Sequence, residues 1–306
     1  MAVGIGFGKV ILFGEHFVVH GIPGIVAGIN DRTIATVENS KKFELIDNRP
    51  ETPGYKAEKL EQQRESMKLI FQKMGIDAES KPVKIVLWGN LLAATGVGAS
   101  AASCAAIARA LAGHFGQDSR DERINEIAFE GEKAYHGNPS GIDNTAATYG
   151  GLLWFIRGTP NRVERIACKK PIDIVMGNTG ITGDTKKAVE AVKERKENNP
   201  ERFEKIFEEA KEIAFKARKA IEEGNIEEIG KLANKNQGLL REIGVSSGEL
   251  EELIGIALEQ GAIGAKLTGG GMGGYMIAVT PGKELQEKVA KSMQEKGYQT
   301  IKTSVG

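Results

Sequence analysis

A glycine-rich turn between an apolar run and an alanine-rich stretch is the first feature that could do chemistry. The turn comprises Thr95, Gly96, Val97, Gly98, Ala99 and Ser100. Its glycines let the backbone come close to a ligand, and the free N–H groups at the start of the following helix face an anion. We expect all six residues to bind phosphate.

Two other glycine patterns indicate different phosphate-binding folds, and each fails on a detail. Residues 96–101 match a loose G-x-G-x-x-A dinucleotide pattern, but residues 114–120 contain no second apolar strand ending in an acid that could hold a ribose. Gly4 to Lys9 resembles a P-loop, yet only three residues separate its outer glycines and Val10 follows the lysine. The sequence therefore favours neither a Rossmann nor a P-loop enzyme.

Glu132 is expected to bind a metal ion. It lies beside an apolar helical stripe and should face inward, where a carboxylate is costly unless it is paired or metal-bound. The Mg²⁺ that accompanies ATP takes one or two protein oxygens and fills its other positions with phosphate and water. Ser100, at the phosphate turn, could supply the second protein oxygen.

Asp143 and Lys9 form the candidate catalytic pair. Asp143 follows a glycine-proline turn, eleven residues after Glu132, where a carboxylate could accept the proton of an attacking hydroxyl during phosphoryl transfer. Lys9 stands next to glycines early in a strand and would keep that carboxylate ionised. The alternatives are a turn or cap aspartate for Asp143 and an ordinary exposed lysine for Lys9.

The remaining candidates are expected to contact the substrate. Glu15 and His16 follow the apolar run 10–13, where either side chain could hydrogen-bond a polyol or an acid, and His20 is a further candidate. Gly270 lies in a segment, 269–274, that has five glycines in six residues. Because such a segment loses much backbone entropy on folding, close approach to a ligand explains it better than a flexible linker.

The elements that must position these residues fall into two predicted domains, residues 1–160 and 161–306. In the first, β-branched runs predict strands and apolar spacing predicts helices. The expected strands are 10–13, 25–27, 33–37, 83–88 and 150–156, and the expected helices are 57–74, 99–112 and 121–136, the last stopped by Gly137.

A turn signal at residues 158–161 marks the start of the second domain, because the composition of the sequence changes after it. Residues 184–243 are rich in lysine and glutamate and carry apolar residues at helical spacing, which predicts solvated helices. Ser246 and Glu249 suggest a capping box for a helix that ends near Gly261, and strands are expected at 275–280 and 298–305.

Composition limits the partners. The 306 residues contain 41 Lys plus Arg and 41 Asp plus Glu, so no net field would attract nucleic acid or a membrane surface. Two cysteines favour a reducing cytoplasm, and without a long apolar run or a basic leader we expect a soluble, unprocessed protein. The expected partner is a small molecule, and a homodimer remains an open alternative.

Three glycine-bearing segments together resemble the motifs of the GHMP kinase superfamily. They are residues 8–21, residues 96–100 and residues 264–274, and the acidic segment 136–151 is also similar. The resemblance implies an α+β, two-domain fold, with an N-terminal domain like domain 2 of ribosomal protein S5 and a ferredoxin-like C-terminal domain. It also implies ATP and Mg²⁺ as cofactors.

The same resemblance assigns roles to individual residues. It implies Asp143 as the catalytic base, Lys9 as its partner and transition-state stabiliser, and Ser100 with Glu132 as metal ligands. Glu15 and His16 would contact the substrate, and Thr185 aligns with a family threonine near the site.

The implied reaction is phosphorylation of mevalonate to 5-phosphomevalonate in isoprenoid biosynthesis. The alternatives are a kinase of phosphomevalonate, homoserine or a sugar, and a superfamily member that binds a ligand without catalysis. Two positions depart from the family pattern: Ala99 stands where a serine is usual, and Met272 interrupts the third glycine segment.

Overall fold

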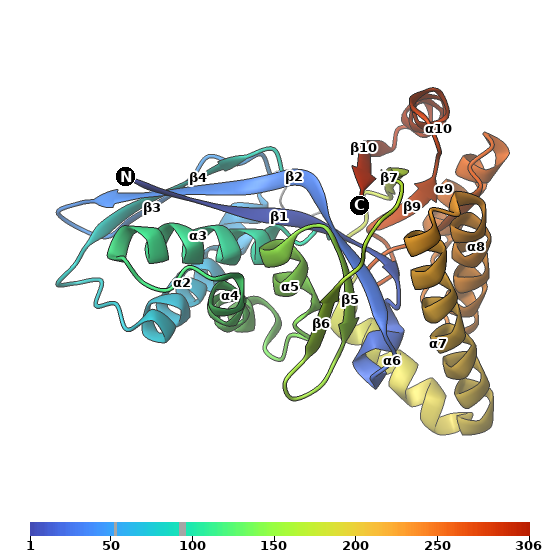
Figure 1. The fold of residues 1–306 in the computed structure, drawn as a ribbon, viewed down its shortest axis with the longest axis horizontal. Helices are drawn as coiled ribbons and strands as arrows, with labels where there is room; N and C mark the ends of the chain where they lie inside the picture. The colour runs from blue at the N-terminus through green and yellow to red at the C-terminus, as the bar shows by residue number, and fades with distance from the viewer. Residues whose placement is uncertain (52–53, 92–95) are drawn as a thin grey trace. The chain divides into compact units, whose positions relative to one another are not determined.

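The computed structural model describes residues 1–51, 54–91 and 96–306 (Figure 1). These residues form two compact units. The N-terminal unit consists of residues 1–9 and 28–150, and the C-terminal unit consists of residues 10–27 and 151–306. Strands β1 (Ala2–Phe13) and β2 (Gly24–Asn39) each contribute residues to both units. The described helices include none that is long and apolar enough to cross a membrane.

The N-terminal unit is a sheet with helices packed on one face (Figure 1). In the sheet, β2 pairs antiparallel with β4 (Val83–Gly89), and β3 (Glu44–Asp47) pairs parallel with β4, while β1 also pairs with β2. The helices are α1 (Tyr55–Glu58), α2 (Leu60–Met74), α3 (Ala99–Phe115), α4 (Asp121–His136) and α5 (Ile142–Tyr149). The predicted helix at 121–136 is confirmed, and Gly137 ends it with a positive φ of 64°.

Small side chains let α3 approach the sheet closely. Nearly all of its residues from 99 to 112 are buried, and most of them are alanine. Opposite them on β1, Gly4 and Gly6 come so near that an added Cβ would collide with the α3 backbone at Ala106 and Ala102. The alanine-rich sequence therefore has a packing reason in addition to helix propensity.

The C-terminal unit contains an antiparallel sheet of order β10-β7-β9-β8. Its strands are β7 (Ile172–Asn178), β8 (Gly264–Leu267), β9 (Tyr275–Val279) and β10 (Gln299–Val305). Two further strands, β5 (Leu152–Ile156) and β6 (Arg162–Arg165), pair with each other, and β5 also pairs with residues 24–27 of β2. The helical elements are η1 (His16–His20), α6 (Thr185–Asn198), α7 (Pro200–Glu223), α8 (Ile226–Glu242), α9 (Gly248–Glu259) and α10 (Lys283–Glu295).

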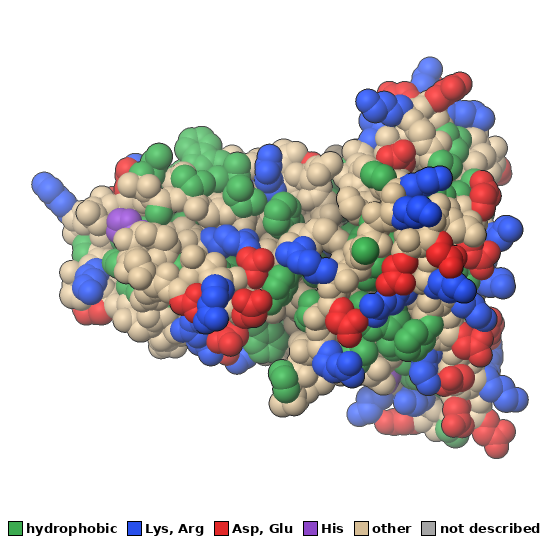
Figure 2. Space-filling view, in the orientation of Figure 1, with side chains coloured by type: hydrophobic (Ala, Val, Ile, Leu, Met, Phe, Trp, Pro, Cys, Tyr) green, Lys and Arg blue, Asp and Glu red, His purple; other side chains and the backbone are tan. Residues whose placement is uncertain are grey.

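The lysine- and glutamate-rich stretch forms α6, α7 and α8, as predicted. On α7, Phe203, Ile206 and Ile213 are buried, whereas Glu212 and Lys216 form an exposed i,i+4 ion pair. Figure 2 shows both signs of charge mixed over the visible surface, which is typical of solvated helices.

The predicted capping box before α9 is wrong, because the N-cap lies one residue later than expected and the N3 residue is then Leu250, which has no carboxylate to complete the box. Ser247 is the N-cap, and its hydroxyl accepts a hydrogen bond from the Leu250 N–H. Ser246 instead donates to the Glu251 carboxylate at 2.5 Å. Both serines have the side chain that an N-cap requires, so residue type alone does not select between them.

Gly6→Ala should lower the free energy of unfolding by about 1–3 kcal/mol, because the new Cβ forces β1 and α3 apart. Gly238→Ala is the matched control: it lies within α8 with no atom near the added Cβ, and should be neutral or stabilise by up to about 1 kcal/mol. Urea unfolding followed by circular dichroism measures both. Equal stability of Gly6→Ala and the parent protein would contradict the close packing described here.

Candidate active site

Lys9 and Asp143 meet in the N-terminal unit. Lys9 is buried on β1, and its Nζ lies 3.0 Å from Oδ1 of Asp143, in the first turn of α5. Burial alone would raise the pKa of Asp143, but the charges of Lys9 and then His136 outweigh it and hold that pKa below its usual value. Asp143 is therefore a carboxylate at neutral pH, in contact with an ammonium group.

The phosphate turn adjoins this pair. Gly96 and Gly98 have φ angles of 78° and 75°, a conformation that favours glycine, and Gly98 is the N-cap of α3. A Cβ at Gly98 would strike the Lys9 side chain, and the Lys9 N–H donates to the Val97 carbonyl at 2.8 Å. The turn is thus attached to the strand that carries Lys9, while the predicted phosphate contact Thr95 lies outside the described residues.

Glu132 faces inward as predicted, with only 1% of its surface exposed. Burial, and then the charge of Asp143, raise the pKa of Glu132 to about 8, although a hydrogen bond from Ser100 and the charge of Lys9 oppose the shift. Ser100 and Glu132 are therefore brought together. His136, one helical turn later, places Nε2 at 3.6 Å from Oε2 of Glu132.

These groups fit a divalent cation. A carboxylate that is buried this fully is unfavourable as an anion unless a positive charge accompanies it, and the nearest lysine is already paired with Asp143. A hydroxyl and a carboxylate oxygen are ligands that Mg²⁺ accepts. Their role as ligands stays a prediction.

The predicted substrate residues lie in the C-terminal unit. Nε2 of His16 is 2.8 Å from the Gly270 carbonyl, and an added Cβ at Gly270 would strike the Thr185 side chain. Burial lowers the pKa of His16, so the ring is neutral and Nε2–H donates to that carbonyl. Nδ1 is then an acceptor, buried and without a partner among the residues described.

His20 lies at the end of the same short helix, η1. Its ring centroid is 4.8 Å from that of Phe207, and burial, followed by the nearby charge of Lys196, lowers its pKa. The ring therefore stays neutral at neutral pH. Contact with a substrate stays a prediction for His20.

Glu15 is held by the protein itself. Its Oε1 pairs with Lys266, and its Oε2 accepts a hydrogen bond from Asn236 at 3.0 Å, with all three side chains almost fully buried. The predicted direct contact of Glu15 with substrate stays untested, and the partners seen here give its carboxylate a supporting role next to His16. Lys266 and Asn236 were not predicted, although Lys266 lies within the glycine-bearing segment 264–274.

The third glycine segment has a different explanation from the one expected. Added Cβ atoms at Gly271 and Gly273 would collide with the carbonyl oxygens of Val245 and Ile181. Met272, with a φ of 57°, donates from its N–H to the same Val245 carbonyl at 2.8 Å. Close approach to the protein's own backbone therefore accounts for these glycines without a ligand.

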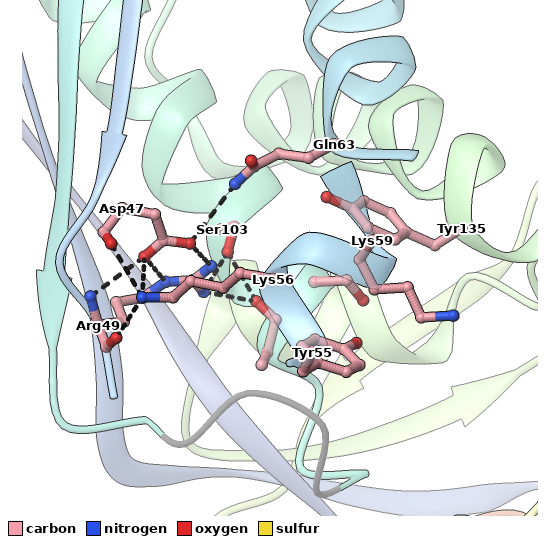
Figure 3. Close-up of a pocket in the computed structure, with 10 residues that line it drawn as sticks. Asp47, Arg49, Tyr55, Lys56, Lys59, Gln63, Ser103 and Tyr135 are labelled. Carbon is pink, nitrogen blue, oxygen red and sulfur yellow. Dashed lines mark hydrogen bonds and ion pairs between the residues drawn. The ribbon is translucent and has the colours of Figure 1, made fainter. Parts of the chain in front are cut away.

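A polar cluster around Arg49 in the N-terminal unit was not predicted from the sequence (Figure 3). The Arg49 guanidinium pairs with Asp47 at 2.7 Å and donates to the Ala99 carbonyl at 3.2 Å and to the Ser103 hydroxyl. These contacts join the end of β3 to the first turn of α3. The only signal in the sequence was two opposite charges, two residues apart, where β3 ends.

A pocket opens beside this cluster (Figure 3). Most of the side chains that line the pocket are polar or aromatic. The lining residues are Asp47, Arg49, Tyr55, Lys56, Lys59, Gln63, Ala99, Ser100, Ser103 and Tyr135. Lys56 closes one side, because its Nζ donates to the carbonyls of Asp47 and Arg49. The pocket therefore reaches Ser100 and the phosphate turn from the side of β3.

Two family models match the chain. The model of the GHMP kinases N terminal domain covers residues 63–151, and that of the GHMP kinases C terminal covers residues 217–299. The mevalonate kinase of Pyrococcus furiosus is 33% identical over 97% of this chain and 94% of its own, and that of Aeropyrum pernix is 34% identical with the same coverage. The crystal structure of L. major mevalonate kinase in complex with R-mevalonate superposes with a TM-score of 0.94, at 36% identity, over 100% of this chain and 96% of that one.

The chain therefore belongs to the GHMP kinases, and the predicted α+β two-domain fold of that superfamily is confirmed. The relatives named above, matched over nearly their full length, come from one branch of this superfamily. That branch is the mevalonate kinases, and the predicted recognition is confirmed.

The raised pKa of Glu132 predicts a pH-dependent stability in the absence of metal. In the unfolded chain this carboxyl ionises near 4.5, and in the folded protein near 8, so its contribution to stability is present below pH 4.5 and is lost as the pH rises to about 8. Glu132→Gln should remove this loss. Urea unfolding in EDTA at several pH values measures the free energy of unfolding of both proteins. Plotted against pH, the two free energies should diverge from pH 4.5 to 8 and then run parallel. Parallel plots over the whole range would contradict the raised pKa of Glu132.

Arg49→Met should destabilise the protein by about 2 kcal/mol, because it removes the hydrogen bonds of the buried guanidinium to Ala99 and Ser103 and leaves the half-buried Asp47 carboxylate with only the more distant Lys56. Arg64→Met is the control, since it breaks an exposed pair with Glu61 and should change stability by less than about 0.5 kcal/mol. Thermal unfolding of both variants gives the comparison. Similar losses in the two variants would show that the Arg49 cluster is not structural.

Proposed function

We propose that this protein transfers the γ-phosphate of ATP to the primary hydroxyl of mevalonate, giving 5-phosphomevalonate and ADP. The observation that carries the proposal is the Lys9–Asp143 pair beside a glycine turn at a helix start, in a chain of the mevalonate kinase branch. The balanced charge and two free cysteines favour a cytoplasmic enzyme with a small-molecule substrate.

Asp143 is proposed as the general base. Its carboxylate accepts the proton of the substrate hydroxyl as that oxygen forms a bond to the γ-phosphorus and the bond to the ADP oxygen breaks. Lys9 keeps Asp143 ionised before the transfer and stabilises the negative charge on the moving phosphoryl group. Because Asp143 has a lowered pKa, it is a weak base, and proton removal is therefore expected late in the transfer.

ATP is proposed to approach from the pocket beside Arg49. The phosphates would bind at the start of α3, where the first backbone N–H groups have no helical carbonyl to bond. Tyr55 and Tyr135 offer apolar ring surface for the base, and Lys56 and Lys59 offer positive charge. A Mg²⁺ ion held by Ser100 and Glu132 would neutralise charge on the phosphates.

Mevalonate is proposed to bind near His16, Gly270 and Thr185. The unpartnered Nδ1 of His16 is an acceptor suited to a hydroxyl of the substrate. The buried Glu15–Lys266 pair would hold the start of η1, and hence His16, in place. A buried polar atom without a partner is costly, which favours a ligand that supplies a donor.

Asp143→Asn should lower kcat by at least about 100-fold while leaving ATP affinity nearly unchanged, because the amide cannot take the proton but occupies the same volume. Asp118→Asn is the control, since Asp118 pairs with the exposed Arg120. A coupled ADP-release assay and calorimetric titration with a non-hydrolysable ATP analogue give the two readings. Retained turnover in Asp143→Asn would remove Asp143 as the base.

The substrate assignment is tested separately with the parent enzyme. Mevalonate, phosphomevalonate, homoserine and galactose are compared in the same assay. Turnover of one of the others without turnover of mevalonate would refute the proposed function while leaving kinase chemistry in place.

A further inference from the structure

Glu132 and His136 are one helical turn apart on α4 and point to the same place. Residues four apart share a helix face, and here Nε2 of His136 and Oε2 of Glu132 are separated by 3.6 Å. That distance is too long for a hydrogen bond. It is close to the separation, about 3.0–3.5 Å, of two donors that each lie about 2.1 Å from a shared metal ion.

The surroundings of this pair contain two carboxyl groups and a single lysine. One donor atom from each of Glu132, His136 and Asp143 lies within 4.8 Å of the others. Lys9 is paired with Asp143, so the buried Glu132 carboxylate has no lysine or arginine of its own among the ion pairs of the described residues. A cation placed between Glu132 and His136 would supply the missing positive charge.

His136 also has the access and chemistry of a ligand. About half of its side chain is exposed, whereas Glu132 is buried, so an ion can reach the pair from the imidazole side. A neutral imidazole offers one nitrogen lone pair, and nitrogen ligands favour first-row transition ions over Mg²⁺. Two oxygen ligands alone would not create that preference.

We propose that His136 is a ligand of the divalent cation, through Nε2 and together with Glu132 and Ser100, and that the site is a mixed nitrogen–oxygen site that also takes Mn²⁺. Asp143 keeps its ion pair with Lys9 and contributes charge without binding the ion. The inference rests on the proposed function in that it concerns the cation of the same site.

The test is pulsed electron paramagnetic resonance of the full-length protein with Mn²⁺ and no nucleotide or mevalonate. A directly bound histidine should give a ¹⁴N coupling to Mn²⁺. His136→Gln should lose that coupling and weaken Mn²⁺ binding by about 10-fold or more, and Glu132→Gln should also weaken it. His114→Gln, which removes a histidine hydrogen-bonded to Asn39 at the far end of α3, should change neither.

The nitrogen coupling and the Mn²⁺ affinity decide the inference, and turnover is needed only to separate it from the proposed function. A bound Mn²⁺ without nitrogen coupling, a coupling that survives in His136→Gln, or no Mn²⁺ binding by the parent protein at millimolar concentration would overturn it. Nitrogen coupling in a protein that does not phosphorylate mevalonate would refute the proposed function alone. Mevalonate turnover without the coupling would refute the inference alone.

Discussion

The N-terminal site depends on one constraint, which is that two carboxyl groups lie near a single lysine and only one of them is paired with it. Asp143 has Lys9 at 3.0 Å and keeps a lowered pKa, while Glu132, buried nearby, has its pKa raised to about 8. Both groups are carboxyl groups, and their environments shift their pKa values in opposite directions. Asp143 is an anion at neutral pH beside an ammonium group, whereas burial keeps Glu132 largely protonated there. These two environments suit the proposed base and the proposed metal ligand.

In the C-terminal unit, the buried charged and polar groups are paired with one another. Glu15, Lys266 and Asn236 have almost no exposed surface and satisfy one another. A buried ion pair of this kind adds little net stability compared with apolar residues, but removing one member leaves an unpaired charge. The cluster holds the strand end next to the short helix that carries His16, and Nδ1 of His16 has no hydrogen-bond partner among the described residues.

Local pattern predicted much of this arrangement. The extent of α4, its end at Gly137 and the inward direction of Glu132 followed from helical spacing, and Lys9 and Asp143 were correctly expected to meet. What could not be predicted depends on contacts between segments distant in sequence. Arg49 reaches α3 fifty residues later, and the glycines at 271 and 273 are explained by carbonyls of Val245 and Ile181, which no sequence window contains.

The contact of Gly4 and Gly6 with α3 limits the substitutions that β1 can accept. Cβ atoms added at Gly4 and Gly6 would collide with the α3 backbone, so neither position has room for a side chain. A larger residue at either glycine would push α3, the helix that bears Ser100, away from β1.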